Sequence, residues 1–411
     1  MTLVSIYADW STQLPGRLLP RTWKADPTID APPRYRRACT YSAFVPDELR
    51  SLAVRLDGQL VGLISEAEQS IRRLNDEGGP ALDPLARLLL RTESIASSKV
   101  EGMQLGVREL ARAEARAESG GAPGVTAAEV LANIDAMVLA VDEAAAVERF
   151  GVEEIVAIHR RLLERAPHKR IAGKLRTQQN WVGGNDYNPC GAEFVPPPAE
   201  QIDRLLVDLC RTINDETLSP LVQAALIHAQ FETIHPFDDG NGRTGRALVH
   251  VVLRRRAIAP RFLPPISVVF AGARDRYIGG LTTFRGNGVT EWIEDFVTAT
   301  DRAARLARAY VTAVRALQER WRNQLRASGN APRADAAAWT IIDILPAHPM
   351  ISAPVAAAVI RRAKSGVYEA IEQLIAAGVL LPLSEGRRNR WWEAAGLLDL
   401  IGDLENGRAP S

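Results

Sequence analysis

The stretch of sequence that decides the fold is His235-Pro-Phe-Asp-Asp-Gly-Asn-Gly-Arg-Thr-Gly-Arg246. It lies between two apolar runs, residues 221–234 and 243–256, whose composition predicts a helix on each side. Gly240 and Gly242 allow the backbone of the turn to approach a ligand closely. Because the free N–H groups and the dipole at the start of a helix favour an anion, the stretch predicts an anion-binding turn between two helices.

The side chains of this stretch match the needs of phosphate chemistry. His235 can accept a proton near neutral pH. Asp239 offers a carboxylate beside the turn, and Mg²⁺ binds one or two such oxygens together with phosphate and water. Arg243 and Arg246 share one helix face and can form paired hydrogen bonds with phosphate oxygens. Together these residues predict a site that holds a nucleoside triphosphate and attacks one of its phosphates.

The stretch resembles the signature of the Fic family: His, any residue, Phe, any residue, Asp or Glu, Gly-Asn-Gly-Arg, two residues of any type, and Arg. Every fixed position is met. The resemblance implies a mainly α fold, with a Fic-type helical core and a small β-hairpin flap. It also implies protein adenylylation, in which AMP passes from ATP, bound with Mg²⁺, to a Ser, Thr or Tyr hydroxyl of a target protein while pyrophosphate leaves.

The resemblance assigns a role to each residue of the signature. His235 would deprotonate the target hydroxyl, Asp239 would hold Mg²⁺, and Phe237 would anchor the loop. Positioning and charge stabilisation would then carry the rate. The remaining residues would contact the phosphates, with the anion-binding site formed by Gly240, Asn241, Gly242 and Arg243, and the γ-phosphate bound by Arg246.

A second motif lies upstream, at Ser97-Ser98-Lys99-Val100-Glu101-Gly102. Residues 85–98 have helical composition, and Gly102 is a typical helix stop. The motif resembles the Fic inhibitory motif, which is Ser or Thr, three residues of any type, Glu, and Gly or Asn. The resemblance implies that Ser97 and Glu101 belong to an inhibitory helix, and that Glu101 pairs with Arg246 and occupies the γ-phosphate site. The alternative is an ordinary helix end with a surface glutamate.

Residues 173–198 contain a Gly-Gly pair and a run of three prolines, and this pattern predicts a hairpin. By resemblance, the hairpin is the flap that aligns the target segment by strand addition. The resemblance also places Ser267 and Tyr277 near the nucleotide, with Tyr277 in contact with the adenosine. The five other histidines lack the spacing of metal ligands, and we interpret His228 as structural.

Composition indicates the setting. The chain has 411 residues, and its 50 basic and 49 acidic side chains give a net charge of +1, so no polyanion-binding surface is expected. Cys39, Cys190 and Cys210 lack any CxxC spacing, and we expect reduced thiols in a cytoplasmic protein. The first ten residues have neither a basic region nor a long apolar stretch, and no window has the length of a membrane span.

The chain divides into three predicted regions. Residues 1–125 form an N-terminal arm and a helical region with the inhibitory helix, and residues 11–47 of it are expected to be an irregular arm because they are rich in Pro and Arg. Residues 126–326 form the Fic catalytic core, closed by one long helix at 292–326. Residues 335–411 form a winged-helix-like domain after a short linker.

The third region, residues 335–411, has its own pattern of predicted helices and strands. Helices are expected at 339–345, 352–362 and 365–376, followed by two strands around a wing at 385–389. DNA binding normally needs basic side chains on the third helix. Here that helix has none and carries Glu369 and Glu372. The basic residues lie instead in the turn before it and in the wing: Arg361, Arg362, Lys364, Arg387, Arg388 and Arg390. The pattern therefore disfavours DNA binding and favours a protein contact or a homodimer.

Two classes of function stay open from the sequence. The first is a self-inhibited AMP transferase, acting on a target protein or on itself. The second is a DNA-binding regulator whose Fic core senses a nucleotide. The complete signature favours the enzyme. Within the enzyme class, the same site could use another nucleotide or could remove AMP.

Overall fold

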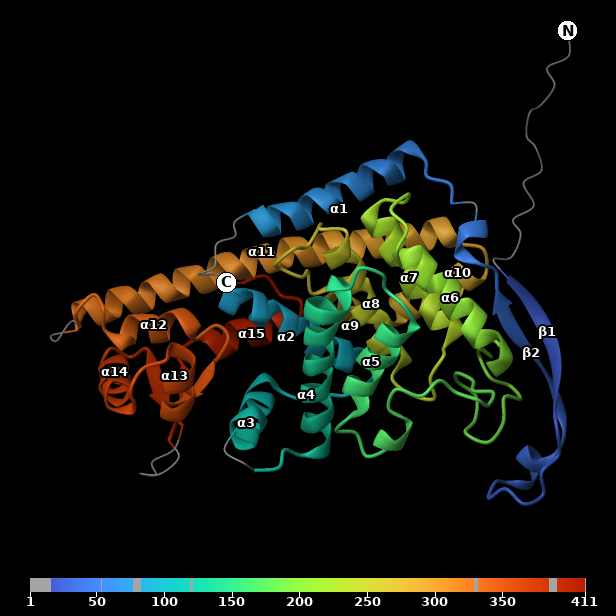
Figure 1. Cartoon of the computed structure of the whole chain (residues 1–411), viewed down its shortest axis with the longest axis horizontal. Coiled ribbons are helices and arrows are strands. Elements are labelled where there is room, and N and C mark those ends of the chain that lie inside the picture. The colour runs from blue at the N-terminus through green and yellow to red at the C-terminus, as the bar shows by residue number, and fades with distance from the viewer. Residues whose placement is uncertain are drawn as a thin grey trace, which may run out of the picture.

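The computed structural model describes residues 16–52, 54–76, 83–118, 121–328, 332–383 and 390–410. This part of the chain is mostly helical, with two small antiparallel sheets, so the predicted mainly α fold is confirmed (Figure 1). The first ten residues and the wing arginines Arg387 and Arg388 lie outside the described residues. Up to the end of the long helix, the α-helices are α1 (Gly58–Asp76), α2 (Asp83–Val100), α3 (Val107–Glu118), α4 (Val125–Val138), α5 (Val152–Leu163), α6 (Ile202–Ile213), α7 (Pro220–Ile234), α8 (Asn241–Arg255), α9 (Ile266–Gly272), α10 (Arg274–Arg285) and α11 (Val289–Ala327).

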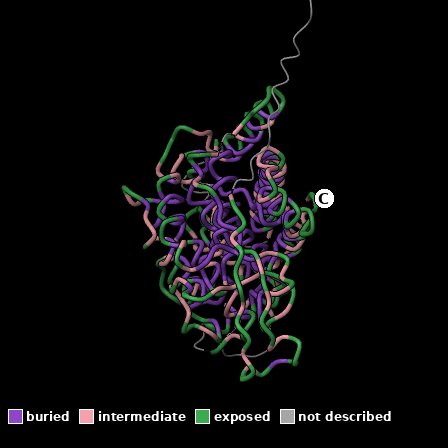
Figure 2. Tube along the Cα trace, turned by 90° about the vertical axis from the view of Figure 1, so that its right-hand side faces the viewer, coloured by how far each residue is buried: buried purple, intermediate pink, exposed green. Residues whose placement is uncertain are grey.

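The helix α7 lies in the middle of the molecule. Ser219 caps it by accepting a hydrogen bond from the N–H of Val222, and Pro220 occupies its first turn, where the missing N–H has no consequence. Every residue of α7 from Leu221 onward is buried, and α8 packs along it. Figure 2 shows this buried centre inside an exposed outer layer. The apolar runs on either side of the signature are therefore two neighbouring core helices, as predicted.

The N-terminal segment is a β-hairpin, so the expected irregular arm is wrong for residues 16–23 and 39–46, which are strands. Strands β1 (Gly16–Trp23) and β2 (Cys39–Pro46) pair antiparallel over their whole length. Pro20 is tolerated because each strand of a two-stranded sheet has a free edge, where a missing N–H breaks no ladder. The pairing depends on a partner about twenty residues away, which local Pro and Arg content does not reveal.

The cysteine prediction is also wrong for two of the three residues. Cys39, at the start of β2, forms a disulfide with Cys190. Cys210 is a free, buried thiol on α6, and burial raises its pKa to about 12. The bonded cysteines are 151 residues apart in sequence and meet only because β2 runs beside residues 181–195, so no local spacing could indicate the bond.

Residues 181–195, the flap segment, form the expected hairpin only in part. One antiparallel bridge joins Val182 to Phe194. The N–H of Phe44 in β2 donates to the carbonyl of Val195 at 2.9 Å, which attaches the end of this segment to the N-terminal hairpin. The flap segment is thus attached to β2 at two points, by the disulfide and by this backbone contact.

The C-terminal region packs on the rest of the molecule through α11. The second half of α11 shares a hydrophobic core with α2 and with the C-terminal elements (Figure 1). In the described part of the chain, no helix is both long and apolar enough to cross a membrane. The C-terminal sheet has the strand order β3 (Met350–Ser352), β5 (Trp391–Ala394), β4 (Leu380–Pro382). The C-terminal elements are α12 (Ala337–Ile344), β3 (Met350–Ser352), α13 (Ala353–Ile360), α14 (Lys364–Ala376), β4 (Leu380–Pro382), β5 (Trp391–Ala394) and α15 (Leu397–Glu405).

Candidate active site

The signature turn joins the end of α7 to the start of α8. His235 ends α7 in the left-handed conformation, with φ 49° and ψ 59°, and its N–H still donates to the carbonyl of Phe231. Such a backbone costs about 1–3 kcal/mol for a residue other than glycine and is typical of functional sites. Gly240, at φ 79°, begins α8. The turn therefore places the histidine next to the N-terminus of a buried helix.

The loop between these helices is anchored by its own aromatic residue. Phe237 is fully buried and stacks on the ring of His159, with 3.6 Å between ring centroids and 7° between planes. The side chain of Asn241 accepts from the N–H of Phe237 at 2.9 Å and donates to its carbonyl at 2.8 Å. His159 Nε2 also lies 2.9 Å from the carbonyl oxygen of Asp239. The anchoring role expected of Phe237 thus has a clear physical basis.

Two residues that sequence reasoning missed hold the same loop from the flap side. Arg176 is almost fully buried, and its Nε donates to the carbonyl of His235 at 2.8 Å. Asn180 donates through Nδ2 to the carbonyl of Phe237 at 3.0 Å. Both residues lie more than 50 positions before the signature, and neither carries a local signal of this role.

The ring of His235 is neutral over most of the pH range. Burial lowers its pKa to about 4, and the nearby charge of Arg176 lowers it further, against a hydrogen bond to Glu232 that raises it. Its Nδ1 lies 3.3 Å from the carbonyl oxygen of Glu232, an arrangement that favours a proton on Nδ1. We infer that Nε2 keeps a free lone pair and is the basic atom.

Asp239 is the exposed carboxylate of the site, with 46% of its side chain accessible. Burial raises its pKa, but Arg243, with Nη2 at 3.6 Å, and His168, with Nε2 at 2.7 Å, outweigh it, so the pKa lies below the usual value. His168 was not identified from the sequence, because it lies 71 residues away. The described residues hold no cluster of three metal-binding side chains.

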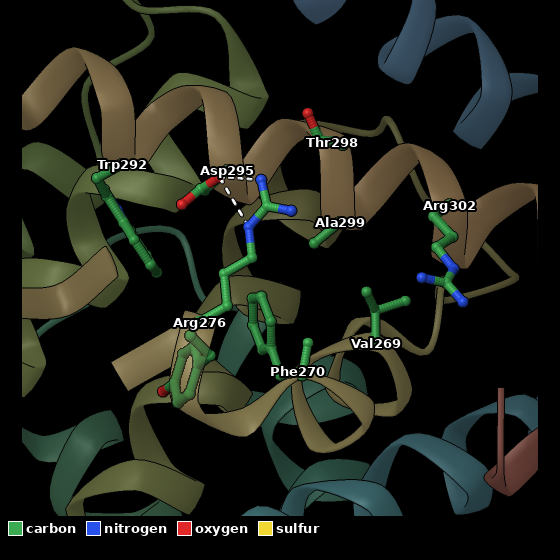
Figure 3. A pocket seen from close by; sticks show the side chains of 10 residues that line it. Val269, Phe270, Arg276, Trp292, Asp295, Thr298, Ala299 and Arg302 are labelled. Carbon is green, nitrogen blue, oxygen red and sulfur yellow. Dashed lines mark hydrogen bonds and ion pairs between the residues drawn. The ribbon is translucent and has the colours of Figure 1, made fainter. Parts of the chain in front are cut away.

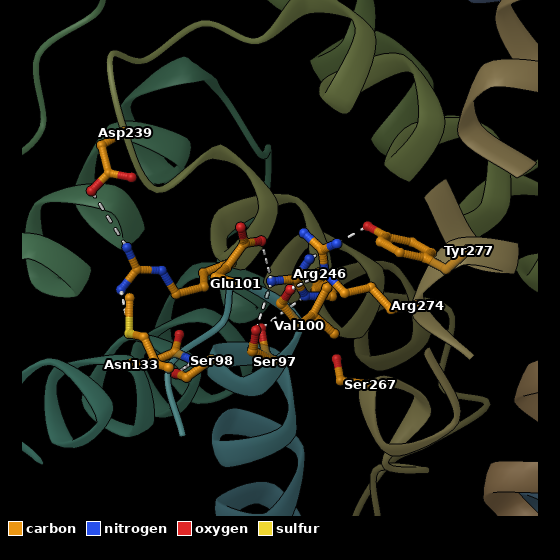
Figure 4. Close-up of polar contacts among 12 residues, drawn as sticks. Ser97, Ser98, Val100, Glu101, Asn133, Asp239, Arg246, Ser267, Arg274 and Tyr277 are labelled. Carbon is orange, nitrogen blue, oxygen red and sulfur yellow. Dashed lines mark hydrogen bonds and ion pairs between the residues drawn. The ribbon is translucent and has the colours of Figure 1, made fainter. Parts of the chain in front are cut away.

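The upstream motif reaches the signature as predicted, with Glu101 beside Arg246 (Figure 4). Arg246 Nη2 donates to Glu101 Oε1 at 2.8 Å, its Nε donates to Ser97 Oγ at 2.9 Å, and its Nη2 also donates to the Ser97 carbonyl at 2.8 Å. A Cβ atom on Gly242 would lie 2.0 Å from Glu101 Oε1. The Glu101 carboxylate thus lies directly against the first turn of α8, in space that only a glycine leaves free.

The charge on Glu101 is well supported in this position. Burial raises its pKa, but the charge and hydrogen bond of Arg246, helped by Arg243, outweigh that effect and hold the pKa below the usual value. A lowered pKa means that the pair persists at neutral pH and is lost only in acid. A second carboxyl group, Glu232, lies near Arg246, and burial raises its pKa to about 7. Sequence reasoning did not identify Glu232, which carries no motif.

The two downstream residues, Ser267 and Tyr277, both have buried polar partners. Ser267 is buried and donates through both its N–H and its Oγ to the carboxylate of Glu93, so it links α9 to α2. The hydroxyl of Tyr277 lies 3.4 Å from Arg246 Nη1 and 2.9 Å from Nε2 of the buried His228. Tyr277 therefore helps to position Arg246, and His228 has the structural role expected of it.

A small cleft lies on the other side of Tyr277, between α9, α10 and α11 (Figure 3). Phe270 and Trp292 form its apolar walls, and Arg276 pairs with Asp295 at 2.6 Å on its rim. Its volume of about 100 Å³ is below the roughly 300 Å³ at which small-molecule sites begin. The cleft is therefore too small for a nucleoside.

The fold and the site together define a class of protein: a mainly helical protein with an anion-binding turn between two buried core helices and a histidine beside it. Comparison with known proteins agrees. The Fic/DOC family matches residues 149–253, and the Fic/DOC family N-terminal region matches residues 61–142. Residues 61–142 and 149–253 of this chain are thus similar to the two parts of the Fic/DOC family.

Individual relatives share this region. The chain is 34% identical to the protein adenylyltransferase fic-1 of Caenorhabditis elegans over 120 residues, which cover 28% of this chain and 22% of that protein. It is 34% identical to the protein adenylyltransferase Fic of Nematostella vectensis over 133 residues, which cover 32% and 28%. The similarity thus spans less than a third of these relatives. A Fic family protein from Desulfovibrio desulfuricans G20 has the same fold, with a TM-score of 0.51, 19% identity, and coverage of 84% of this chain and 98% of that one.

Proposed function

We propose that this protein is a protein adenylyltransferase, which transfers AMP from ATP to a Ser, Thr or Tyr hydroxyl of a target protein or of itself. The observation that carries the proposal is the arrangement of three groups around one turn: the free Nε2 side of His235, the N-terminus of α8, and the guanidinium of Arg246. The similarity to relatives named protein adenylyltransferases supports it.

The reaction follows from these positions. The N-terminal N–H groups of α8 and the Arg243 side chain would bind the phosphates of ATP, and Arg246 would bind the γ-phosphate. His235 Nε2 would take the proton of the target hydroxyl as its oxygen bonds to the α-phosphorus. The bond from that phosphorus to the bridging oxygen breaks, and pyrophosphate leaves with its electron pair. The protein itself does little covalent chemistry in this reaction, so stabilisation of charge and positioning of the reactants account for the rate.

The residues present fit a Mg²⁺ ion, although the described residues hold no three-ligand cluster. Mg²⁺ in nucleotide sites takes one or two carboxylates and completes its shell with phosphate and water. Asp239, ionised and half exposed, would be that carboxylate. The ion would neutralise charge on the phosphates, and the chain's own contribution is to hold Asp239 in place through Arg243 and His168.

We further propose that the enzyme rests in a self-inhibited state. The carboxylate of Glu101 occupies the face of Arg246 that a γ-phosphate needs. The carboxylate and the γ-phosphate are both negatively charged. Like charges at contact distance repel each other. Productive binding would therefore require Glu101 to leave. Removal of AMP is the second candidate, because the same carboxylate lies beside Gly242, where it could orient a water molecule.

The chemistry is tested with two labels. The purified protein is incubated with ATP labelled either at the α- or at the γ-phosphate, and the protein fraction is counted. We expect label on the protein from the α-labelled nucleotide only, since AMP is retained and pyrophosphate leaves. Label from the γ-position would mean phosphoryl transfer and would overturn the proposal. The same assay with GTP, CTP and UTP determines nucleotide choice.

The protonation of His235 gives a pH prediction. Because its pKa lies at about 4 in the folded protein, the ring is neutral and ready to accept a proton at every pH above about 5. We expect its ring ¹H signal, assigned by its loss in a His235→Asn variant, to titrate with a midpoint near 4. A midpoint near 6.5 would contradict the account of a desolvated base.

We propose a winged-helix module for residues 335–411, on the order of its elements: helix, strand, two helices, two strands. On α14, Tyr368, Glu369 and Glu372 are exposed. The two carboxylates would repel a DNA backbone, so a protein contact or a homodimer suits this face better. We retain a cytoplasmic location, where ATP is available, although the bond between Cys39 and Cys190 is more typical of an oxidising compartment.

A further inference from the structure

A second, larger cavity lies away from the candidate active site. It has a volume of about 670 Å³ and opens between α2, α3, the C-terminal end of α8 and the π-helical turn that follows α4, with Ala347 of the C-terminal region at its edge. Four arginines line it: Arg87, Arg91, Arg254 and Arg261. Three carboxylates share the lining, so the formal charge is 4 minus 3, or +1. Cavities that hold small molecules have volumes of roughly 300–1,000 Å³.

The buried arginine of this cavity is only partly satisfied. Arg91 is 8% exposed, and its Nη1 forms an ion pair with Glu114. Its Nε and Nη2 have no hydrogen-bond partner in the described part of the chain, and the same holds for Nε of Arg254. Buried donors of this kind are normally paired, and an unpaired one calls for an explanation such as an absent ligand. These donors belong to side chains that line the cavity.

No neighbouring protein group fully compensates Arg91. Glu405 of α15, which does not line the cavity, is close enough to Arg91 for the two charges to interact. Burial nevertheless raises the pKa of Glu405 to about 7, so this carboxyl neutralises Arg91 less fully than a carboxyl of ordinary pKa would. Arg91 thus shares its charge with Glu114, while its Nε and Nη2 donors remain available to an anion.

We propose that this cavity binds a small molecule that carries a phosphate group. Guanidinium groups from two different helices, α2 and α8, face one space, and the fork of an arginine matches phosphate oxygens. The carboxylates of Asp83 and Asp142 at the rim would accept hydrogen bonds from hydroxyl or amino groups of the same molecule. Arg91 lies 10 residues before Glu101 (101 minus 91), which corresponds to about 15 Å along a helix. The cavity is therefore distinct from the ATP site.

The cavity also suggests what the ligand does, and this step rests on the proposed function. Arg91 belongs to α2, which ends one residue before Glu101, and Arg254 belongs to the helix that carries Arg246. A molecule bound to both arginines would connect these helices and favour the position in which Glu101 contacts Arg246. Bound ligand would thus strengthen inhibition.

The binding step is tested without any measurement of activity. Thermal unfolding of the full chain is followed against inorganic phosphate, with sodium chloride at matched ionic strength as the blank. We expect phosphate to raise the melting temperature of the wild type and of Arg243→Gln, whose change removes phosphate affinity from the ATP site. In Arg254→Gln and Arg87→Gln we expect about tenfold weaker apparent phosphate affinity, and in the surface control Arg161→Gln no change.

Arg254 and Arg87 are chosen because neither is fully buried, so their replacement leaves the core intact. No phosphate-dependent rise in the wild type would overturn the proposal. So would a rise that disappears in Arg243→Gln but persists in both cavity variants, because the phosphate would then bind at the ATP site. Neither result depends on AMP transfer, so failure here leaves the proposed function standing.

Discussion

Replacement of His235 by alanine is expected to lower the rate of AMP transfer about 10²- to 10⁴-fold, which is the usual contribution of a general base. The side chain is the basic group at the turn, with Nδ1 directed to a backbone carbonyl and Nε2 free. The measurement is the rate of mass increase of the modified protein in the Glu101→Gly background, where the basal rate is high enough to follow.

The controls for this variant address backbone and fold. Alanine is strained at φ 49°, whereas asparagine tolerates the left-handed conformation, so His235→Asn removes the base with less cost to the backbone. His348→Gln changes a histidine of the C-terminal region and should leave the rate unchanged. Transfer that persists in a folded His235→Asn protein would assign the base to another group.

Replacement of Glu101 by glycine is expected to raise AMP transfer about 5- to 150-fold, the range of a typical coupling between sites. The change removes the 2.8 Å contact to Arg246 and clears the space in front of Gly242, so a γ-phosphate can bind there. The measurement is again the initial rate of label or mass gain with saturating ATP.

Two further variants separate charge from volume. Glu101→Gln keeps the size of the side chain but removes its charge, and we expect an intermediate rate, since an amide repels a phosphate less than a carboxylate does. Glu109→Gly makes the same substitution at an exposed position of α3 and should not activate. Equal rates in the wild type and Glu101→Gly would mean that the upstream motif is a helix end without a regulatory role.

The local parts of this account could be predicted from the sequence, because they depend on neighbours in the chain. The helices on both sides of the turn follow from apolar runs, and the position of Gly240 follows from the need for a positive φ at the start of α8. The contact between Glu101 and Arg246 came only through the resemblance to a family. Their separation of 145 residues contains no signal that would bring them together.

The long-range parts were missed or misjudged for the same physical reason. Arg176 and His168 carry no motif, and their roles appear only when the chain brings them against the carbonyl of His235 and the carboxylate of Asp239. The N-terminal hairpin and the Cys39–Cys190 bond are likewise pairings between distant segments. The composition of these segments predicted an irregular arm and reduced thiols, because composition contains no information about which distant segment each of them contacts.

The most direct test of the central claim is the intact mass of three proteins after incubation with Mg²⁺ and ATP: the wild type, Glu101→Gly, and Glu101→Gly combined with His235→Ala. The account predicts an added mass of one AMP that is small in the wild type, large in the single variant and absent in the double variant. An equal gain in all three would contradict the roles of both residues. No gain in any of them, with ATP still bound, would contradict AMP transfer to itself and direct attention to an added target protein, another nucleotide or the removal of AMP.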